Sequence, residues 1–111
     1  MFGGIYKNRR VLVTGHTGFK GSWLCKWLEI LGSKVVGYSL KPSVHPNHFD
    51  QLGLKVESSF NDIVEYSTIK RVFSKFQPEI VFHLAAQPLV LESYDNPLKT
   101  FNTNIMGSVN I

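Results

Sequence analysis

The chain has 111 residues, of which 43% are hydrophobic and 18% are charged; this composition is typical of one globular domain and excludes a disordered segment. No apolar run approaches the ~18 residues of a membrane helix, no secretory signal is visible, and the single cysteine, Cys25, favours a reducing cytoplasm. The net charge is +4, but lysines and arginines are scattered along the chain, so neither nucleic acid nor a membrane is expected as a partner.

A short strand and an amphipathic helix open the predicted pattern. The sequence RVLVT, residues 10–14, is a β-rich run that stops at a glycine, which is typical of a buried strand. Apolar residues then recur at helical spacing over residues 19–31, and Gly32 is placed to end that helix. The side chains that we expect to pack on the sheet are Trp23, Trp27, Leu28 and Leu31.

Strands and helices alternate along the rest of the chain. Further strands are expected at residues 34–38, 55–60 and 79–86. The first two of these are separated by an irregular excursion at residues 41–53, which is rich in proline and asparagine.

Two more helices complete the pattern. One is expected at residues 67–76, and another from Asn96-Pro97 to Ile111, with asparagine as the N-cap and proline at the first helical position. Alternating strands and helices predict parallel βαβ units with right-handed crossovers. The predicted fold is therefore α/β, the N-terminal half of a doubly wound parallel-sheet (Rossmann) domain with strand order 3-2-1-4.

Three glycines, Gly15, Gly18 and Gly21, lie three residues apart between the first strand and the first helix. In such a turn the first glycine allows the tight turn, the second lets the backbone approach a pyrophosphate, and the third permits close contact between helix and strand. The helix adds the positive end of its dipole. The turn predicts a dinucleotide site, and a P-loop is excluded because no Lys-Ser/Thr pair follows at the required spacing.

The string TGHTGFKG resembles the TGxxGFxG fingerprint of the extended short-chain dehydrogenases/reductases, in the branch of epimerases and dehydratases that act on nucleotide sugars. The strings PEIVFHLAAQPLV, SYDNP and TNIMGSVN extend the resemblance over residues 9–111 and favour the dehydratases. The resemblance implies a lyase of carbohydrate biosynthesis, with NAD as cofactor and a nucleotide sugar, CDP-glucose, as substrate. Hydride would pass transiently to bound NAD while water is eliminated to give CDP-4-keto-6-deoxyglucose, in a homo-oligomer when the protein is full length.

The resemblance also assigns cofactor-binding residues. Those of the pyrophosphate loop are Gly15, Thr17, Gly18, Phe19, Lys20 and Gly21. Asp62 and Ile63 correspond to a pair that faces adenine. The segment that lines the cofactor after the fourth strand is Leu84, Ala85, Ala86 and Gln87. In the next helix, Asn104 of the Thr103-Asn104 pair corresponds to an asparagine that helps to order the active site.

One position departs from the usual dinucleotide pattern. A ribose-binding carboxylate is expected about 20 residues after the glycines, but no acidic residue lies between Glu29 and Asp50. An NADP enzyme would replace this acid by a cation, and Lys41 is near that position. The dehydratases that the chain resembles need a cofactor held throughout, because the same hydride is taken up and returned. We therefore expect NAD, with Ser39 available to a ribose hydroxyl.

Tyr66 and Lys70 have the Tyr-x-x-x-Lys spacing of the superfamily's catalytic pair. They precede the fourth strand, however, whereas the resemblance places the pair on a helix after a fifth strand. We therefore expect no catalytic residue in this chain, because that pair would lie beyond Ile111. Residues 1–111 would then form a partial NAD-binding Rossmann domain, which ends before the catalytic helix and the substrate domain.

No metal site is expected among the histidines. His45 and His48 are close in sequence, but no third ligand is near and Pro46 indicates a loop. His83, inside an apolar strand, is expected to be a hydrogen-bonded core residue. His16, in the glycine loop, either lines the cofactor or faces solvent.

Two other functions stay open at this point. An epimerase of the same superfamily shares the glycine loop and differs in substrate. A non-catalytic module that senses NAD(P) would keep the loop and lack the Tyr-x-x-x-Lys pair. Such a pair on a helix after a fifth strand would decide for an enzyme.

Overall fold

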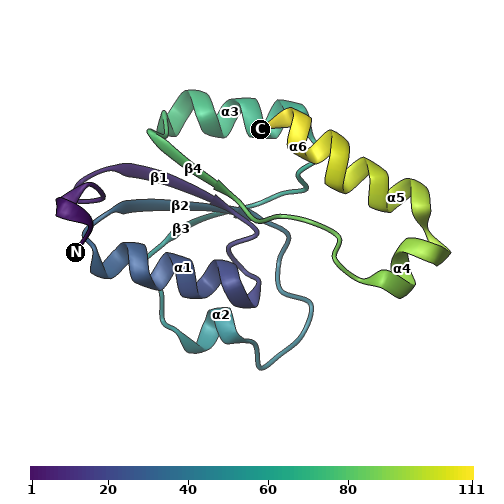
Figure 1. Ribbon diagram of the computed structural model, residues 1–111, viewed down its shortest axis with the longest axis horizontal. Helices are drawn as coiled ribbons and strands as arrows, with labels where there is room; N and C mark the ends of the chain where they lie inside the picture. Colours follow the sequence, from purple (N-terminus) through teal and green to yellow (C-terminus); the bar gives the residue numbers. More distant parts are fainter.

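The computed structural model describes residues 1–111 and contains one four-stranded sheet between helical layers (Figure 1). The strands are β1 (Arg10–Thr14), β2 (Lys34–Ser39), β3 (Glu57–Phe60) and β4 (Ile80–His83). Their order in the sheet is β3-β2-β1-β4, and all three neighbouring pairs are parallel. The predicted doubly wound Rossmann fold and its 3-2-1-4 strand order are therefore confirmed.

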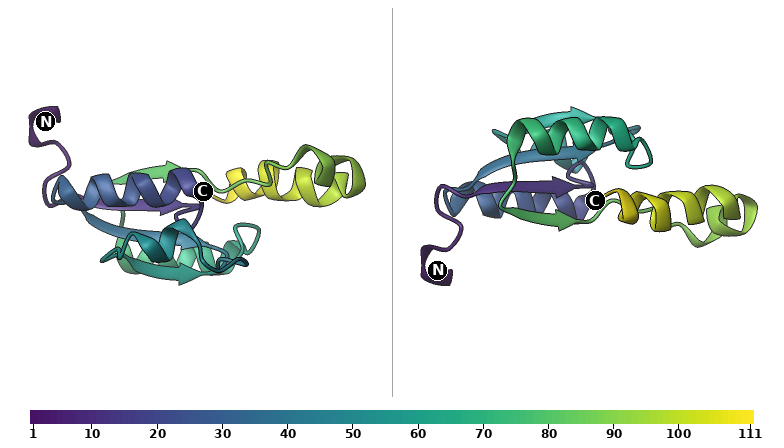
Figure 2. Two further views of the ribbon diagram at one scale, coloured as in Figure 1. Left: turned by 90° about the horizontal axis from the view of Figure 1, so that it is seen from below. Right: turned by 90° about the horizontal axis from the view of Figure 1, so that it is seen from above.

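Helices lie on both faces of the sheet. α1 (Phe19–Ile30) covers one face with α2 (His48–Gln51) beside it, and α3 (Tyr66–Phe76) covers the other (Figure 1). After β4 the chain continues past the carboxyl ends of the strands, so that its last helical segments project from the sheet (Figure 2). These segments are α4 (Val90–Asp95), α5 (Pro97–Phe101), the π turn η2 (Asn102–Met106) and α6 (Gly107–Asn110), and a 3-10 turn, η1 (Phe2–Gly4), precedes β1. None of the helices combines the length and the apolar character needed to cross a bilayer.

Successive residues of the central strand β1 face opposite helical layers. Val11 and Val13 pack with Cys25 and Leu28 of α1. Leu12, which lies between them, packs into the cluster on the α3 face. This alternation follows from the period of two in a strand. Apolar residues occupy all three central positions of β1 because a parallel sheet is covered on both sides.

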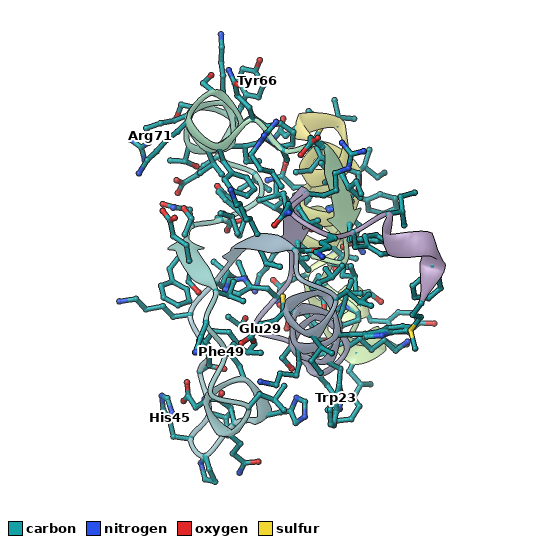
Figure 3. All side chains as sticks on the ribbon, turned by 90° about the vertical axis from the view of Figure 1, so that its left-hand side faces the viewer. Trp23, Glu29, His45, Phe49, Tyr66 and Arg71 are labelled. Atoms are coloured by element: carbon teal, nitrogen blue, oxygen red, sulfur yellow. The ribbon has the colours of Figure 1, made fainter.

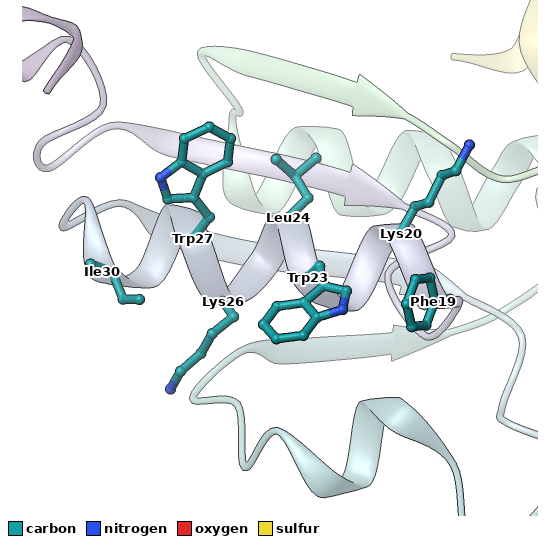
Figure 4. A pocket seen from close by; sticks show the side chains of 7 residues that line it. All are labelled: Phe19, Lys20, Trp23, Leu24, Lys26, Trp27 and Ile30. Atoms are coloured by element: carbon teal, nitrogen blue, oxygen red, sulfur yellow. The ribbon is translucent and has the colours of Figure 1, made fainter.

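α1 packs on the sheet through a narrow stripe, and the two tryptophans lie outside it. Cys25 and Leu28 are buried in this stripe, and Leu31 is half-buried. Trp23 and Trp27 are 51% and 46% exposed, so the prediction that they pack on the sheet is wrong. Each residue turns a helix by ~100°, which places positions 23 and 27 on the side opposite to position 25. Both tryptophans belong to an apolar outer face of α1 (Figure 4).

The last predicted helix is present but is interrupted by a π turn. Pro97 begins α5 as expected, whereas the side chain of Asn96 does not cap it and instead donates to a carboxylate of α4 at 3.2 Å. The chain stays helical through η2 to Asn110, whose Nδ2 donates to the carbonyl oxygen of Ile63 at 3.1 Å. This bond fastens the end of α6 to the turn that precedes α3. The sequence patterns did not predict α4.

Replacing Leu28 by alanine tests which face of α1 is buried. We expect Leu28→Ala to lower the free energy of unfolding by about 2–5 kcal/mol, because the side chain is only 1% exposed and leaves a cavity. Ile30→Ala is the matched control on the same helix. Its side chain is 73% exposed, so the change should stay within about 0.5 kcal/mol. Urea unfolding measures both, and equal losses would contradict this packing.

Candidate functional site

The loops that follow the four strands lie at one edge of the sheet. Thr14 at the end of β1 pairs with Tyr38 on β2 and with His83 on β4, and Ser39 pairs with Phe60 on β3. Because the strands are parallel, all four end at this edge, which is where doubly wound sheets bind nucleotides. The predicted cofactor residues at or just after these strand ends are Gly15, Thr17, Gly18, Phe19, Lys20, Gly21, Ser39, Asp62, Ile63 and residues 84–87.

Gly15 and Gly21 bring β1, α1 and the loop after β4 into close contact. Gly15 has a φ of +70°, in the left-handed region that favours glycine. A Cβ at Gly15 would lie 2.8 Å from the backbone nitrogen of Ala85, and a Cβ at Gly21 would overlap the carbonyl oxygen of Gly15. Packing therefore requires glycine at both positions.

Gly18 lies in the least enclosed part of the same loop. A Cβ there would meet only the Gly15 carbonyl oxygen, at 3.3 Å. Gly18 is the N-cap of α1, whose first turn contains Lys20 and no acidic residue. The first backbone N–H groups of a helix have no partner within it, and the helix dipole adds positive potential there. An anion that approaches Gly18 therefore meets free donors and positive charge.

Thr17 links the glycine loop to the end of β2. Its Oγ1 lies 2.8 Å from the Oγ of Ser39 and donates to the carbonyl oxygen of Leu40 at 3.1 Å. A hydroxyl has one proton, and that of Thr17 is given to the carbonyl, so Ser39 is the donor in the pair. Both lone pairs of Ser39 stay available to accept hydrogen bonds. The Nζ of Lys41 lies 5.9 Å from the centre of the Phe60 ring.

Phe19 and His45 lie beside α2, and His48 is the first residue of that helix. The rings of Phe19 and His48 have centres 4.8 Å apart, and Nδ1 of His48 lies 2.6 Å from Oγ of Ser22. His45 is exposed, with Nδ1 3.2 Å from a carboxylate oxygen of Asp50. His48 therefore fastens α2 to α1. The structure groups no three His, Cys, Asp or Glu side chains as a metal site would require.

Tyr38 holds the turn that contains the predicted adenine-facing pair. Its hydroxyl donates to the carbonyl oxygen of Asp62 at 2.9 Å, and the Asp62 carboxylate accepts the N–H of Val64 at 3.2 Å. Burial raises the pKa of Tyr38, so the phenol stays neutral. The side chain of Ile63 is buried in the core on the α3 face, beside Gly107. Asp62 is thus the half-buried member of the pair at the strand edge.

His16 is buried under the glycine loop, and the alternative that it faces solvent is wrong. Its Nε2 lies 2.8 Å from Oγ of Ser58 on β3. The ring packs over Gly37 of β2, where a Cβ would overlap it. Burial lowers the pKa of His16 to about 4, so the ring is neutral at pH 7. A glycine inside a strand is the sequence signal for such a close approach, and Gly37 could have located His16.

A polar network that the sequence patterns did not predict joins β1 and β4 to the last helix. Oγ1 of Thr14 accepts the backbone N–H groups of Leu84 at 3.0 Å and of Ala85 at 3.1 Å. His83 lies between two hydroxyls, with Nδ1 2.7 Å from Oγ1 of Thr14 and Nε2 2.9 Å from Oγ of Ser108. The prediction that His83 is hydrogen-bonded is confirmed.

Asn104 reaches back from the π turn to the loop after β4. Its Oδ1 accepts the N–H of Gln87 at 2.7 Å, and its Nδ2 donates to the carbonyl oxygen of Gln87 at 3.1 Å. The side chain of Gln87 in turn bonds to Leu89 and Thr100. Single π turns occur frequently at functional sites, and here the turn carries the side chain that holds residue 87.

Tyr66 and Lys70 occupy a different setting. Tyr66 is 56% exposed in the first turn of α3 and lies on the outer side of this helix, across the sheet from Trp23 (Figure 3). Neither of the two side chains forms a hydrogen bond or an ion pair. The pair therefore has the setting of a solvated helix face.

Three features together define an extended short-chain dehydrogenase/reductase. They are the parallel 3-2-1-4 sheet, the glycine turn into α1 and the asparagine that reaches back from the last helix. Residues 12–111 match the family described as GDP-mannose 4,6 dehydratase. The chain belongs to this family.

Individual relatives include dehydratases and epimerases. The chain is 46% identical over 108 residues to a CDP-glucose 4,6-dehydratase of Salmonella typhimurium, covering 96% of this chain and 30% of the relative. The epimerase Mth375 of Methanothermobacter thermautotrophicus superposes with a TM-score of 0.82 at 32% identity, over 96% of this chain and 31% of that one. A UDP-glucose-4-epimerase of Stenotrophomonas maltophila, with bound NAD, gives 0.81 at 28% identity, over 93% and 32%. The chain thus spans about a third of the length of these proteins.

Acid should destabilise the chain through His16. The pKa is about 4 in the folded chain and 6.5 when the ring is free, so the unfolded chain binds the proton first. The stabilisation is complete above pH 6.5 and is lost as the pH falls toward 4. Between pH 7.5 and pH 5 we expect the free energy of unfolding to fall by about 2 kcal/mol from this residue.

Urea unfolding at the two pH values measures this loss. His16→Phe keeps a ring between Phe49 and Phe60 and removes the titrating group, so its stability should change less with pH. His45→Gln replaces an exposed histidine and should behave like the parent. An unchanged pH dependence in His16→Phe would contradict the role of His16.

Proposed function

We propose that the strand edge binds NAD, and that the chain is the NAD-binding part of a nucleotide-sugar 4,6-dehydratase. The observation that carries this proposal is the glycine loop. Gly15 and Gly21 are closed by packing, while Gly18 between them is the least enclosed of the three, with the Gly15 carbonyl oxygen, 3.3 Å from its Cβ position, as its one close neighbour at the N-terminus of α1. A pyrophosphate needs this combination, because its oxygens must approach backbone N–H groups that no side chain covers.

Ser39 supports NAD rather than NADP. Its proton is donated to Thr17, so it can offer lone pairs to the hydroxyl groups of a ribose. A 2′-phosphate has acceptor oxygens only and would find no donor in Ser39. Lys41, the cation nearest in sequence, lies over the ring of Phe60. The Stenotrophomonas epimerase, which shares the fold, contains bound NAD.

The remaining assigned residues would hold the other parts of the cofactor. Asp62, at the end of β3, offers its carboxylate on the adenine side. Residues 84–87, fixed by Thr14 and Asn104, would line the nicotinamide side. NAD, when bound, supplies a reversible hydride acceptor. This chain's own residues bind and orient that group, and none of them is assigned to proton transfer.

The reaction that we propose is the dehydration of CDP-glucose to CDP-4-keto-6-deoxyglucose, a lyase reaction. Its support is the 46% identity to a CDP-glucose 4,6-dehydratase over nearly the whole chain. The catalytic Tyr-x-x-x-Lys pair and most of the sugar-nucleotide site would lie outside residues 1–111, in a longer polypeptide. The second candidate is epimerisation of a nucleotide sugar, which the structural likeness to epimerases favours.

Cofactor binding should depend on the glycine at position 18 of the loop. In the full-length polypeptide, Gly18→Val should weaken NAD binding by about 3 kcal/mol, or more than a hundredfold, because the branched side chain occupies the pyrophosphate position. The fold should persist, because Gly18 has ordinary backbone angles of −73° and 169°. Isothermal titration calorimetry measures the affinity, and NADP should bind more weakly than NAD.

Gly18→Ala is the matched control, with the same Cβ and no branches, and should lose less affinity than Gly18→Val. Circular dichroism establishes that both variants are folded. Unchanged NAD affinity in Gly18→Val would exclude this loop as the pyrophosphate site. A preference for NADP would instead assign Lys41 to a 2′-phosphate.

Substrate tests separate the candidate reactions. The full-length polypeptide with NAD should convert CDP-glucose to a 4-keto product, detected by the absorbance that alkali develops from the keto sugar. Residues 1–111 alone should form no product, because general acid–base groups must reach the reacting atoms directly. Interconversion of C4 epimers without a keto product would favour the epimerase. NAD binding without any turnover would favour a sensing module.

A further inference from the structure

The hydrogen bonds around His83 run in one direction. The hydroxyl of Thr14 has one proton and two lone pairs. Both lone pairs are used by the backbone N–H groups of Leu84, at 3.0 Å, and of Ala85, at 3.1 Å. The Thr14 proton is therefore directed to Nδ1 of His83, 2.7 Å away. This nitrogen is an acceptor and carries no proton.

The rest of the network follows from this assignment. A neutral imidazole with a bare Nδ1 carries its proton on Nε2, which donates to Oγ of Ser108 at 2.9 Å. Ser108 donates its own proton to the carbonyl oxygen of Asn104 at 2.6 Å. The donors of Thr14, His83 and Ser108 thus point from β1 toward the last helix, and a single neutral tautomer of His83 satisfies these three hydrogen bonds.

A second proton on His83 is incompatible with this arrangement. A protonated Nδ1 would face Oγ1 of Thr14, which already accepts two backbone N–H groups. The N–H of Leu84 also has the carbonyl oxygen of Thr14 at 3.2 Å, but Oγ1 is the acceptor of the Ala85 N–H, which would therefore lose its hydrogen bond. Burial favours the neutral ring and lowers the pKa of His83. The partners of His83 on β1 and α6 are the hydroxyls of Thr14 and Ser108. The charged side chain of β1, Arg10, pairs with Glu79, directly before β4, at the opposite, amino end of the two strands.

The network fixes the segment that leaves β4. Thr14 holds its first two backbone N–H groups, and Asn104 holds both backbone groups of Gln87 at its other end. Gly15 packs directly against Ala85, without room for a methyl group. A shift of residues 84–87 therefore changes the contact with the glycine loop.

We propose that His83 is a positioning residue, whose neutral imidazole holds residues 84–87 and Asn104 against the glycine loop so that its protonation weakens dinucleotide binding. This inference rests on the proposed NAD site. His83 acts through the N–H groups of Leu84 and Ala85 and through the last helix, without touching the cofactor. NAD affinity should be constant at alkaline pH and should fall as the pH decreases through the titration of His83.

Calorimetric titration of the full-length polypeptide with NAD, from pH 8 to pH 5.5, tests the pH dependence. An asparagine at position 83 offers Oδ1 to the Thr14 hydroxyl and does not titrate. We expect the wild-type Kd to rise as the pH falls through this range, toward the loss of affinity that His83→Asn shows. His83→Asn should bind about tenfold more weakly at pH 8, because the link to Ser108 is lost, and its Kd should not change with pH. The exposed residue His45 provides the control, and His45→Asn should retain the wild-type pH dependence.

Nitrogen chemical shifts of His83 measure the tautomer directly in the wild-type protein, independently of any variant. The expected result is a bare Nδ1 and a protonated Nε2 at pH 7.5. A proton on Nδ1, or a wild-type pH dependence in His83→Asn, would overturn the proposal. Absence of NAD binding by the wild type at every pH would overturn the proposed function and this inference with it. The measured tautomer distinguishes that outcome from a failure of this inference alone, because it reports on the His83 hydrogen bonds whether or not NAD binds.

Discussion

The backbone of Gly15 lies so close to α1 and to the loop after β4 that a methyl group at Gly15 would collide with Ala85, and one at Gly21 would collide with Gly15. α1 therefore begins directly against the end of β1, and its unpaired N–H groups are delivered to the edge where β4 ends. Because the sheet is parallel, β2 and β3 end at the same edge. The close backbone contact thus brings α1 to the loop after β4, and the parallel strands bring the loops after β2 and β3 to the same edge.

Neutral polar groups, and not ion pairs, support this edge. His16 bonds to Ser58, Tyr38 to the backbone of Asp62, and His83 to two hydroxyls. Burial favours the uncharged form of all three rings. They satisfy neighbouring donors and acceptors without adding fixed charge. The positive potential at the N-terminus of α1 is therefore not offset by a buried anion among these supports.

Local patterns predicted the elements and the glycine loop, and they failed where contacts are distant in sequence. β1 was predicted at its observed bounds because a β-rich run ends at Gly15. Helical spacing located α1 but gave it two apolar sides, so it could not decide that Cys25 is buried and Trp23 is exposed. The partners of His16 and His83 are 42 and 69 residues away. No sequence periodicity connects residues so far apart, although the glycine at position 37 indicates the close approach of the His16 ring.

The apolar outer face of α1 has an optical consequence. Trp23 and Trp27 are the chain's two tryptophans, and both lie on the helix that carries the glycine turn. The Trp23 ring centre is 4.9 Å from that of His48, and the Trp27 ring centre is 5.5 Å from that of Phe2. All indole fluorescence therefore arises from one helix, with one emitter beside the excursion at residues 41–53 and the other beside the N-terminal arm. The tryptophan emission therefore reports the docking of these two segments, whereas the strands of the sheet contain no tryptophan and contribute no indole emission.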